Sequence, residues 1–235
     1  METVTDKKIV IETRDIAKVY QESKIPVQAL KDVDLEIAEG EFTAIVGPSG
    51  SGKTTLLNII GGLDNPTAGT IKIAGRDISN LKESERIDFR LHNIGFVFQQ
   101  YNLIPVLTAR ENVEFIMLLQ KKPAPEMRER ALHLLEEVGL KDKANVRPSE
   151  LSGGQQQRVA VIRALASRPK FILADEPTAN LDSASAANLL DMMARMNREE
   201  GMTFIFSTHD QRVIDKARRV VTLEDGIIKS DEVRS

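Results

Sequence analysis

The sequence predicts an α/β fold in which two regions of alternating strands and helices enclose a helical insertion. First, residues 42–46 form a short run that is apolar except for Thr43 and leads into a glycine-rich loop and then a helix, as expected for a strand buried on both faces of a parallel sheet. Second, strand-like and helix-like segments alternate again from residue 171 onwards. Third, the stretch between residues 100 and 165 is mostly helical in its apolar spacing.

In the N-terminal part of the chain, the sequence predicts strands before and after one helix. Apolar and polar side chains alternate before residue 40, which is the period of a half-buried strand. Strands are expected at residues 9–20, 29–37, 42–46, 71–73 and 94–98, and a helix at residues 53–61.

Helical periodicity dominates the middle of the chain, and strands return towards its end. Apolar residues at helical spacing stop at Gly139, a residue suited to a helix C-terminus. Asp225 and Gly226 predict a tight hairpin turn, and the polar residues 229–235 predict a frayed tail. Helices are expected at residues 127–138, after Gly154, from Ser183 and from about Asp210, and strands at residues 171–174, 202–207 and 220–223.

These segments indicate one domain over residues 1–235. Residues 1–99 and 166–235 would form its α/β core, and residues 100–165 a helical subdomain. Met193 shares a helix face with small and apolar residues, so it is expected to fill the core. His92 and His133 have no partner pattern and are expected at the surface.

Composition excludes several classes of function. Among 235 residues, 32 are Lys or Arg and 35 are Asp or Glu, which gives a net charge of −3. We therefore expect no nucleic-acid partner, because such binders usually carry a basic excess. Cysteine is absent, which excludes disulfides, zinc-thiolate sites and cysteine nucleophiles. No apolar run reaches the ~18 residues of a membrane span, so membrane contact is expected only through a partner.

A phosphate-binding loop is the strongest local motif. The spacing G-x-x-x-x-G-K-[ST] lies between a predicted strand and a predicted helix, which is the context that supports the motif over a chance glycine-rich turn. Backbone N–H groups and the helix N-terminus would cradle phosphates, Lys53 would neutralise the β- and γ-phosphates, and the Thr54 hydroxyl would bind Mg²⁺. The residues expected to bind the nucleotide are Gly47, Pro48, Ser49, Gly50, Ser51, Gly52, Lys53, Thr54 and Thr55.

Two adjacent carboxylates end the apolar strand at residues 171–174. Asp175 and Glu176 point to opposite faces if the strand continues, so they need not share a role. One could hold Mg²⁺ through water and the other could deprotonate the attacking water. A solvated strand end or a helix N-cap is the simpler alternative, but a P-loop earlier in the chain favours the catalytic interpretation.

A second anion cradle lies in the helical region. Ser152, Gly153, Gly154 and Gln155 stand at the start of a predicted helix, where free N–H groups attract anions. A nucleotide needs only one P-loop, so this cradle could serve the nucleotide of another copy of the chain. A capped helix after a glycine turn is the alternative.

Together these motifs resemble those of ATP-binding cassette (ABC) ATPases. Residues 151–155, Leu-Ser-Gly-Gly-Gln, match the signature motif of that family, and the other family motifs follow in order. The resemblance implies a P-loop NTPase fold with a RecA-like mixed sheet, an N-terminal antiparallel β-subdomain and a helical subdomain. It also implies adenine stacking by Tyr20, a Q-loop at Gln99, a D-loop at residues 179–182 with Asp182, and a switch histidine at His209.

The resemblance implies a head-to-tail homodimer that binds two ATP molecules with Mg²⁺. Each ATP would lie between Lys53 of one subunit and Ser152, Gly153 and Gly154 of the other. Thr54 and Gln99 would bind Mg²⁺ directly, and Asp175 would bind it through water. Glu176 would be the general base, with Lys53, Gln99 and His209 completing the catalytic set.

Residues 99–107 combine apolar side chains with a proline after the Q-loop glutamine. They could be ordinary core under the helical region. The family resemblance favours a groove that accepts a cytoplasmic helix of a transmembrane permease.

Within the family, the runs at residues 56–64 and 95–113 resemble the LolD/MacB/FtsE group. The resemblance implies a peripheral subunit on the cytoplasmic side of the inner membrane that powers lipoprotein release or MacB-type export. FtsE-like cell-division ATPases and haem exporters are the alternatives within this group. A soluble non-transport ABC ATPase is less favoured, because the chain has neither a long coiled-coil insertion, nor zinc cysteines, nor a second cassette.

Overall fold

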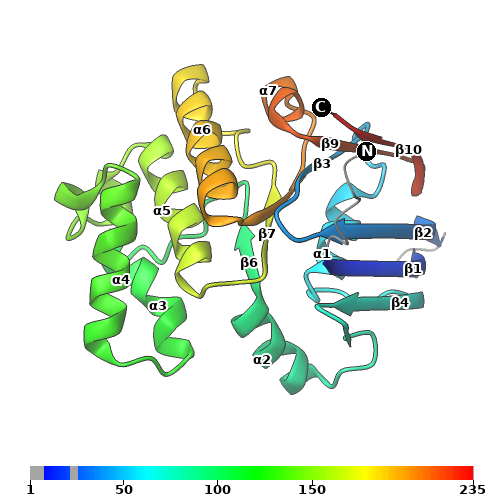
Figure 1. Cartoon of the computed structure of the whole chain (residues 1–235), viewed down its shortest axis with the longest axis horizontal. Helices are drawn as coiled ribbons and strands as arrows, with labels where there is room; N and C mark the ends of the chain where they lie inside the picture. The colour runs from blue at the N-terminus through cyan, green and yellow to red at the C-terminus, as the bar shows by residue number, and fades with distance from the viewer. Residues whose placement is uncertain (1–7, 22–25, 235) are drawn as a thin grey trace, which may run out of the picture.

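The computed structural model describes residues 8–21 and 26–234, and its strands form two sheets (Figure 1). One sheet is antiparallel, with strand order β2-β1-β4-β5. Its strands are β1 (Ile9–Tyr20), β2 (Val27–Ala38), β4 (Ala68–Ile73) and β5 (Arg76–Asp77).

The larger sheet has the strand order β10-β9-β3-β8-β7-β6. Its first five strands in chain order pair in parallel, and only β10 runs antiparallel to its neighbour β9. The strands are β3 (Phe42–Val46), β6 (Ile94–Val97), β7 (Phe171–Asp175), β8 (Thr203–Ser207), β9 (Arg219–Glu224) and β10 (Ile227–Val233). The predicted mixed sheet with an antiparallel subdomain is confirmed.

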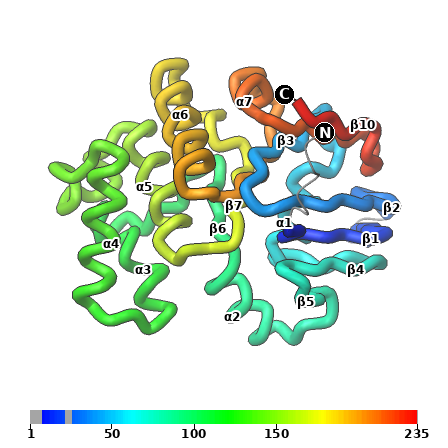
Figure 2. The backbone as a smooth tube through the Cα atoms, viewed as in Figure 1, coloured from blue at the N-terminus to red at the C-terminus, as the bar shows by residue number. Residues whose placement is uncertain are grey.

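Seven α-helices and two 3-10 turns complete the described part of the chain. Figure 2 shows α3, α4 and α5 gathered on one side of the molecule, with β1, β2 and β4 on the opposite side. The helices are α1 (Lys53–Ile60), α2 (Glu83–Asn93), α3 (Ala109–Leu119), α4 (Ala124–Glu137), α5 (Gly153–Ala166), α6 (Ser183–Glu200) and α7 (Gln211–Lys216), and the 3-10 turns are Lys141–Lys143 and Pro148–Glu150. None of these helices is both long and apolar enough to cross a bilayer.

Strands of the parallel sheet are buried on both faces, as their apolar runs predict. In β8, Phe204 and Phe206 join a core under the helices, while Ile205 joins a second core against the antiparallel sheet. Helix α1 lies in that second core, and Leu56 and Ile60 are fully buried there. Burial of the helix that follows the P-loop fixes the loop relative to both sheets.

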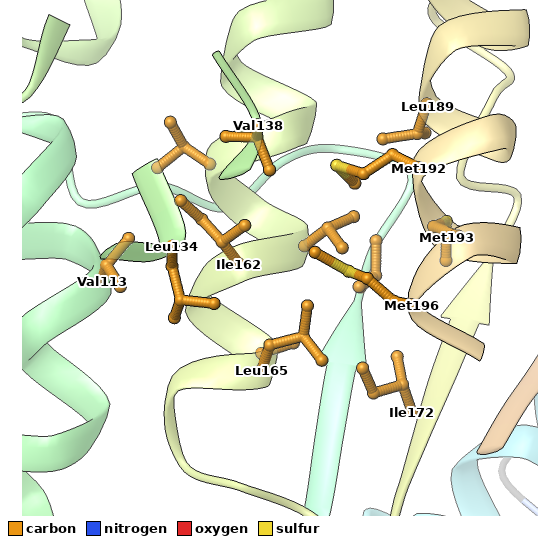
Figure 3. Packing of buried hydrophobic residues seen from close by; sticks show 14 of the residues in the cluster. Val113, Leu134, Val138, Ile162, Leu165, Ile172, Leu189, Met192, Met193 and Met196 are labelled. Carbon is orange, nitrogen blue, oxygen red and sulfur yellow. The ribbon is translucent and has the colours of Figure 1, made fainter. Parts of the chain in front are cut away.

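Methionines of α6 pack into the first core, as expected for Met193. Figure 3 shows Met192 and Met196 directed at the apolar side chains of α5 and β7. Met193 is completely buried, and Met196 is 2% exposed. Unbranched thioether side chains fill the irregular space between a helix and a sheet. His92 and His133 lie at the surface, also as expected.

The prediction of a frayed tail at residues 229–235 is wrong for the residues that the structure describes. The predicted hairpin turn forms, with Asp225 and Gly226 both at positive φ, and it returns the chain as β10. The guanidinium of Arg219 then donates two hydrogen bonds, of 2.7 and 2.6 Å, to the carboxylate of Asp231. A polar edge strand is stable here because its backbone pairs with β9 and its charge pairs with Arg219.

The sequence patterns also missed helix α2. Phe89 is its one buried residue, so its sequence has almost no apolar stripe. Its guanidinium groups tie it to the core instead: Arg90 donates a 2.7 Å hydrogen bond to the carbonyl of Gly62.

Candidate active site

The P-loop is shaped by close backbone contacts at two glycines. Gly47 has φ +147°, and a Cβ there would lie 1.9 Å from the carbonyl oxygen of Leu223 in β9. Gly52 has φ +102°, and its Cβ would lie 2.4 Å from the carbonyl oxygen of Ala29 in β2. Only glycine fits both positions, so the loop can lie between the two sheets only with this sequence.

Lys53 begins α1 and folds back over the loop. Its ammonium donates hydrogen bonds of 2.9 Å to the carbonyls of Gly47 and Pro48, and the residue is 9% exposed. The N-cap of α1 is Gly52, which has no side chain to cap the first turn. The free N–H groups of that turn and the lysine therefore offer positive charge to an anion at the same place.

A cavity of about 560 Å³ opens over this loop. Five parts of the chain contribute to its wall: the start of β2, the P-loop with α1, Gln99 in the loop after β6, and the chain at and just after the ends of β7 and β8. Among the predicted site residues, those that line it are Gly47, Pro48, Ser49, Gly50, Gly52, Lys53, Thr54, Thr55, Gln99, Glu176 and His209. The structure thus brings most of the predicted P-loop site together in one cavity.

Asp175 and Thr54 meet at the edge of the cavity. The Thr54 hydroxyl lies 3.3 Å from each carboxylate oxygen of Asp175 at the end of β7. Gln99 lines the cavity as well. A hydroxyl, a carboxylate and an amide oxygen are the hard donors that Mg²⁺ prefers, so these residues fit that ion.

Glu176 has different partners from the carboxylate beside it. Its Oε1 lies 2.6 Å from Nδ1 of His209, and its Oε2 accepts a 3.1 Å hydrogen bond from the hydroxyl of Thr208. The backbone of Glu176 has φ +46°, which is a strained conformation for a residue with a side chain. This turn directs the carboxylate towards the end of β8, while Asp175 stays beside Thr54.

The segment that carries His209 is anchored by Asp210, which sequence patterns did not single out. Its carboxylate accepts hydrogen bonds from the Arg212 guanidinium and, at 2.6 Å, from the Thr178 hydroxyl. These contacts, the one with Arg212 foremost, lower the pKa of Asp210 to about 2. The hydrogen bond from Thr178 thereby joins the loop after Glu176 to the loop after β8.

The signature residues lie away from this cavity. Ser152 caps α5: its hydroxyl accepts from the Gln155 amide, and its own amide donates to the Gln155 side chain. A Cβ on Gly153 would lie 2.7 Å from the Tyr101 hydroxyl, and one on Gly154 would lie 2.8 Å from the Ser185 hydroxyl. Within one chain, these residues therefore form the capped start of a helix. They do not line the P-loop cavity of the same chain.

Comparison with known proteins identifies the family. A family model described as ABC transporter matches residues 30–179. The chain belongs to the ABC transporter family. It is an ATP-binding subunit and an ATPase of that family, and such subunits work with membrane permease partners.

Similar proteins cover nearly the whole length of this ABC ATPase. It is 48% identical to lipoprotein-releasing system ATP-binding protein LolD 1 of Caulobacter vibrioides, over 94% of this chain and 95% of that one. An ABC transporter ATP-binding protein of Thermotoga maritima is 47% identical, over 97% of each. The ATP-binding cassette MJ0796 has a dimeric structure in a post-hydrolysis state with ADP and Pi; it superposes with a TM-score of 0.88 at 44% identity, covering 96% of this chain and 99% of that one.

Tyr20 and Asp182 of the ABC ATPase lie outside the cavity lining. The Tyr20 hydroxyl donates a 2.9 Å hydrogen bond to Asp64, and the Lys18 ammonium lies 4.8 Å from the ring centroid. Asp182 is the N-cap of α6, and hydrogen bonds from Ser185 lower the pKa of its carboxyl. Adenine stacking by Tyr20 and nucleotide contact by Asp182 stay predictions.

Asn180 links the Q-loop to the D-loop, and sequence reasoning missed it. Its amide donates a 2.9 Å hydrogen bond to the carbonyl of Gln99, and its own carbonyl accepts from the Tyr101 hydroxyl at 3.4 Å. Arg163 of α5 donates to the carbonyls of Tyr101 and Asn102. The only sequence signal was the position of Asn180 within residues 179–182.

Proposed function

We propose that this ABC ATPase is of the LolD/MacB type and powers lipoprotein release, or export of drugs or peptides, through a permease. Its 48% identity to LolD 1 over 94% of the chain supports that group. FtsE-like cell division and haem export are alternatives within the group. The observation that carries the ATPase chemistry is the placement of Glu176 and His209 at the P-loop cavity.

In this proposal the phosphates of ATP bind the P-loop residues 47–55, and Lys53 neutralises their charge. Glu176 accepts a proton from the attacking water through its carboxylate, and His209 contacts the γ-phosphate. The Thr208 hydroxyl and the His209 ring hold the Glu176 carboxylate in place. Positioning and charge stabilisation provide the rate enhancement, as in other phosphoryl-transfer sites.

We propose that Mg²⁺ accompanies ATP, held by Thr54, Gln99 and Asp175. The bound ion would neutralise phosphate charge. The contact between Thr54 and Asp175 supports this assignment, because both side chains already lie at one edge of the cavity. Tyr20 would stack on the adenine.

We propose a head-to-tail homodimer in which Ser152, Gly153, Gly154 and Gln155 complete the nucleotide site of the partner subunit, with Asp182 beside them. Two observations support it: the signature cradle lies outside the cavity of its own chain, and a structure of the similar cassette MJ0796 is dimeric. A two-fold dimer forms both composite sites together. We also propose that residues 1–99 and 166–235 act as the nucleotide-binding core and residues 100–165 as the helical signature subdomain.

The permease would dock in an apolar groove near residues 99–107. A cavity of about 350 Å³ between β6, α3 and α5 supports this location. We call it the docking groove; its lining includes Phe96, Phe98, Ile104, Phe115, Ile116 and Leu119. An apolar helix of the permease would fit such a groove and would place the subunit peripherally on the cytoplasmic side of the inner membrane.

Leu119→Asp tests the docking groove. Leu119 is 49% exposed and lines the groove, so we expect its replacement to abolish permease association while ATP hydrolysis by the isolated subunit is unchanged. Leu118→Asp is the matched control, because Leu118 is 55% exposed and does not line the groove. Leu103 is a poorer target, because it packs against the main core. Equal association of the two variants would contradict this location.

The group assignment is tested by purifying tagged Glu176→Gln protein from native membranes with ATP. We expect mass spectrometry to find a permease with few membrane helices and a large extracytoplasmic domain. Recovery of a many-helix importer permease with a solute-binding protein would contradict the LolD/MacB assignment, and recovery of no membrane protein would favour a soluble ATPase.

A further inference from the structure

A second large cavity, of about 510 Å³, lies where α2, α3 and α5 end and α4 begins. Its lining is strongly basic, and we call it the basic cavity. The cationic and titratable side chains that line it are His92, Lys121, Lys122, Arg130, Arg168 and one carboxylate, Glu126. The nucleotide site does not use any of them, because the P-loop cavity has a separate lining.

Most of these cationic side chains form no salt bridge with a carboxylate of the described residues. Glu126 pairs with Lys122 at 3.3 Å, but in the described ranges 8–21 and 26–234 no salt bridge joins a carboxylate to Lys121, Arg130 or Arg168. His92 faces its own helix, with Nδ1 2.9 Å from the carbonyl of Asp88. Charges of one sign in a recess concentrate the field and attract an anion.

Arg130 is the residue that needs an explanation. Lys121 and Arg168 follow the C-terminal ends of α3 and α5, where the helix dipole favours a cation. Arg130 instead lies inside α4, half-buried, and its Nε is buried without a hydrogen-bond partner among the described residues. Burial and then the charge of Arg168 lower the pKa of its guanidinium, while Glu137 and Glu200 act on it only at longer range. A buried guanidinium N–H without an acceptor is costly unless a ligand supplies one.

The basic cavity adjoins the docking groove. Ser167 lines both, and Gln120, which lines the basic cavity, follows Leu119 of the groove. The Gln120 amide donates hydrogen bonds to the carbonyls of Leu91 and Ser167, which holds the wall between them in place. A helix of the permease that lies in the docking groove would therefore place its following turn beside the cationic side chains of the basic cavity.

We propose that the basic cavity binds carboxylate side chains of an acidic segment that flanks the apolar docking element of the permease. This inference rests on the proposed docking groove and names the chemistry of its partner. Arg130 and Arg168 would hold the carboxylates by charge-assisted hydrogen bonds. A recess lined by side chains from several helices suits individual carboxylates better than the flat surface of a membrane.

Two synthetic helical peptides test the proposal by fluorescence anisotropy. Both have a leucine-rich face, and their last turn carries either three glutamates or three glutamines. We expect the glutamate peptide to bind at least about 10-fold more tightly at low salt, and the preference to weaken as salt is added. Arg130→Gln with Arg168→Asn should remove the preference; asparagine suits the positive φ of residue 168.

Arg128→Gln is the matched control, because Arg128 is exposed on the same helix and does not line the cavity. It should keep the preference. The exposed Arg168 also allows a single change, Arg168→Glu, which should weaken glutamate binding without disturbing the core and without changing ATP hydrolysis.

Equal binding of the two peptides to the unaltered protein would overturn the acidic-site inference alone. Binding of neither peptide would overturn the docking groove as well. Flotation with phosphatidylglycerol vesicles provides the remaining comparison. The carboxylate proposal would be overturned if the unaltered protein floats with the vesicles, the Arg130→Gln, Arg168→Asn protein does not, and the two peptides bind equally. The ligand of the cavity would then be lipid phosphate.

Discussion

The P-loop and the signature loop are both glycine turns that lead into a helix, but they are held differently. A Cβ on Gly52 would lie 2.4 Å from a backbone oxygen of β2, whereas one on Gly154 would lie 2.8 Å from the hydroxyl oxygen and 2.9 Å from the Cβ of Ser185. Gly52 also has φ +102°, which residues with a side chain rarely adopt, whereas Gly154 lies within α5 and has no positive φ. The backbone path of the P-loop therefore requires glycine at residue 52, whereas residue 154 requires it only to leave space for Ser185.

The same contrast extends to polar contacts. Around the P-loop cavity, Lys53, Glu176 and His209 already have partners within the chain. At the signature loop, Ser152 is exposed, and its hydrogen bonds are made with Gln155 and Gln156 of the helix that it caps. In the proposed dimer, the first half-site would therefore be arranged already within one chain, whereas the second would gain further partners from the other subunit.

The largest expected effect comes from Glu176→Gln, which leaves the P-loop intact. The amide cannot accept the proton of the attacking water, so we expect hydrolysis to fall by about 10²- to 10⁴-fold. ATP binding should persist, because the contacts of Lys53 are unchanged. Hydrolysis assays with nucleotide-binding titrations check this, and near-normal turnover would remove Glu176 from the role of base.

A mixing experiment separates the two half-sites. Lys53→Ala and Gly154→Asp should each be nearly inactive, because each destroys one half of both composite sites. In mixed dimers one site combines an intact P-loop with an intact signature loop, so random pairing should restore about a quarter of the original sites. Recovery of ATP hydrolysis on mixing is the readout. Failure to recover, with dimers formed, would count against the head-to-tail arrangement.

Alanine at the two glycines compares their structural roles. We expect Gly52→Ala to lower the free energy of unfolding by on the order of 3 kcal/mol, because of the backbone clash and the φ of +102°. Gly154→Ala should cost less, on the order of 1 kcal/mol, because residue 154 has no positive φ and the new methyl group would displace Ser185 and not a strand backbone, yet it should still impair hydrolysis. Urea unfolding of both variants measures this, and equal losses would contradict the distinction.

The smallest expected effect concerns the anchor of the His209 loop at low pH. The pKa of Asp210 is about 2 in the folded protein and near 3.8 when free, so its stabilisation is complete only above about pH 5 and is lost progressively as pH falls towards 2. Because solvent screens this partly exposed group, we expect it to contribute about 1 kcal/mol to the free energy of unfolding. Between pH 5 and pH 3 the free energy of unfolding should therefore fall more for the original protein than for Asp210→Asn. Parallel plots of unfolding free energy against pH for the two proteins would exclude this contribution.

Local sequence was sufficient for the α/β class, most strands and the P-loop. Residues 42–46 are apolar except for Thr43, and the glycine spacing after them allows only a narrow set of backbone paths. Helix α2 was not predicted, because Phe89 is its only buried residue. Strand β10 was not predicted, because its residues are polar and it is held by Arg219 and by pairing with β9. An element that is held by charged side chains far away in the sequence shows no periodic pattern of apolar residues.

The sequence by itself determined which chemical groups are available and in what order: the lysine, the adjacent carboxylates, the histidine and the second glycine cradle. Only the tertiary structure decided their partners. It sends Asp175 towards Thr54 and Glu176 towards His209, and it brings Arg130 of α4 and Arg168 after α5 to one cavity. The physical reason is that side-chain direction depends on backbone turns and on packing between segments far apart in the chain, which no local pattern encodes.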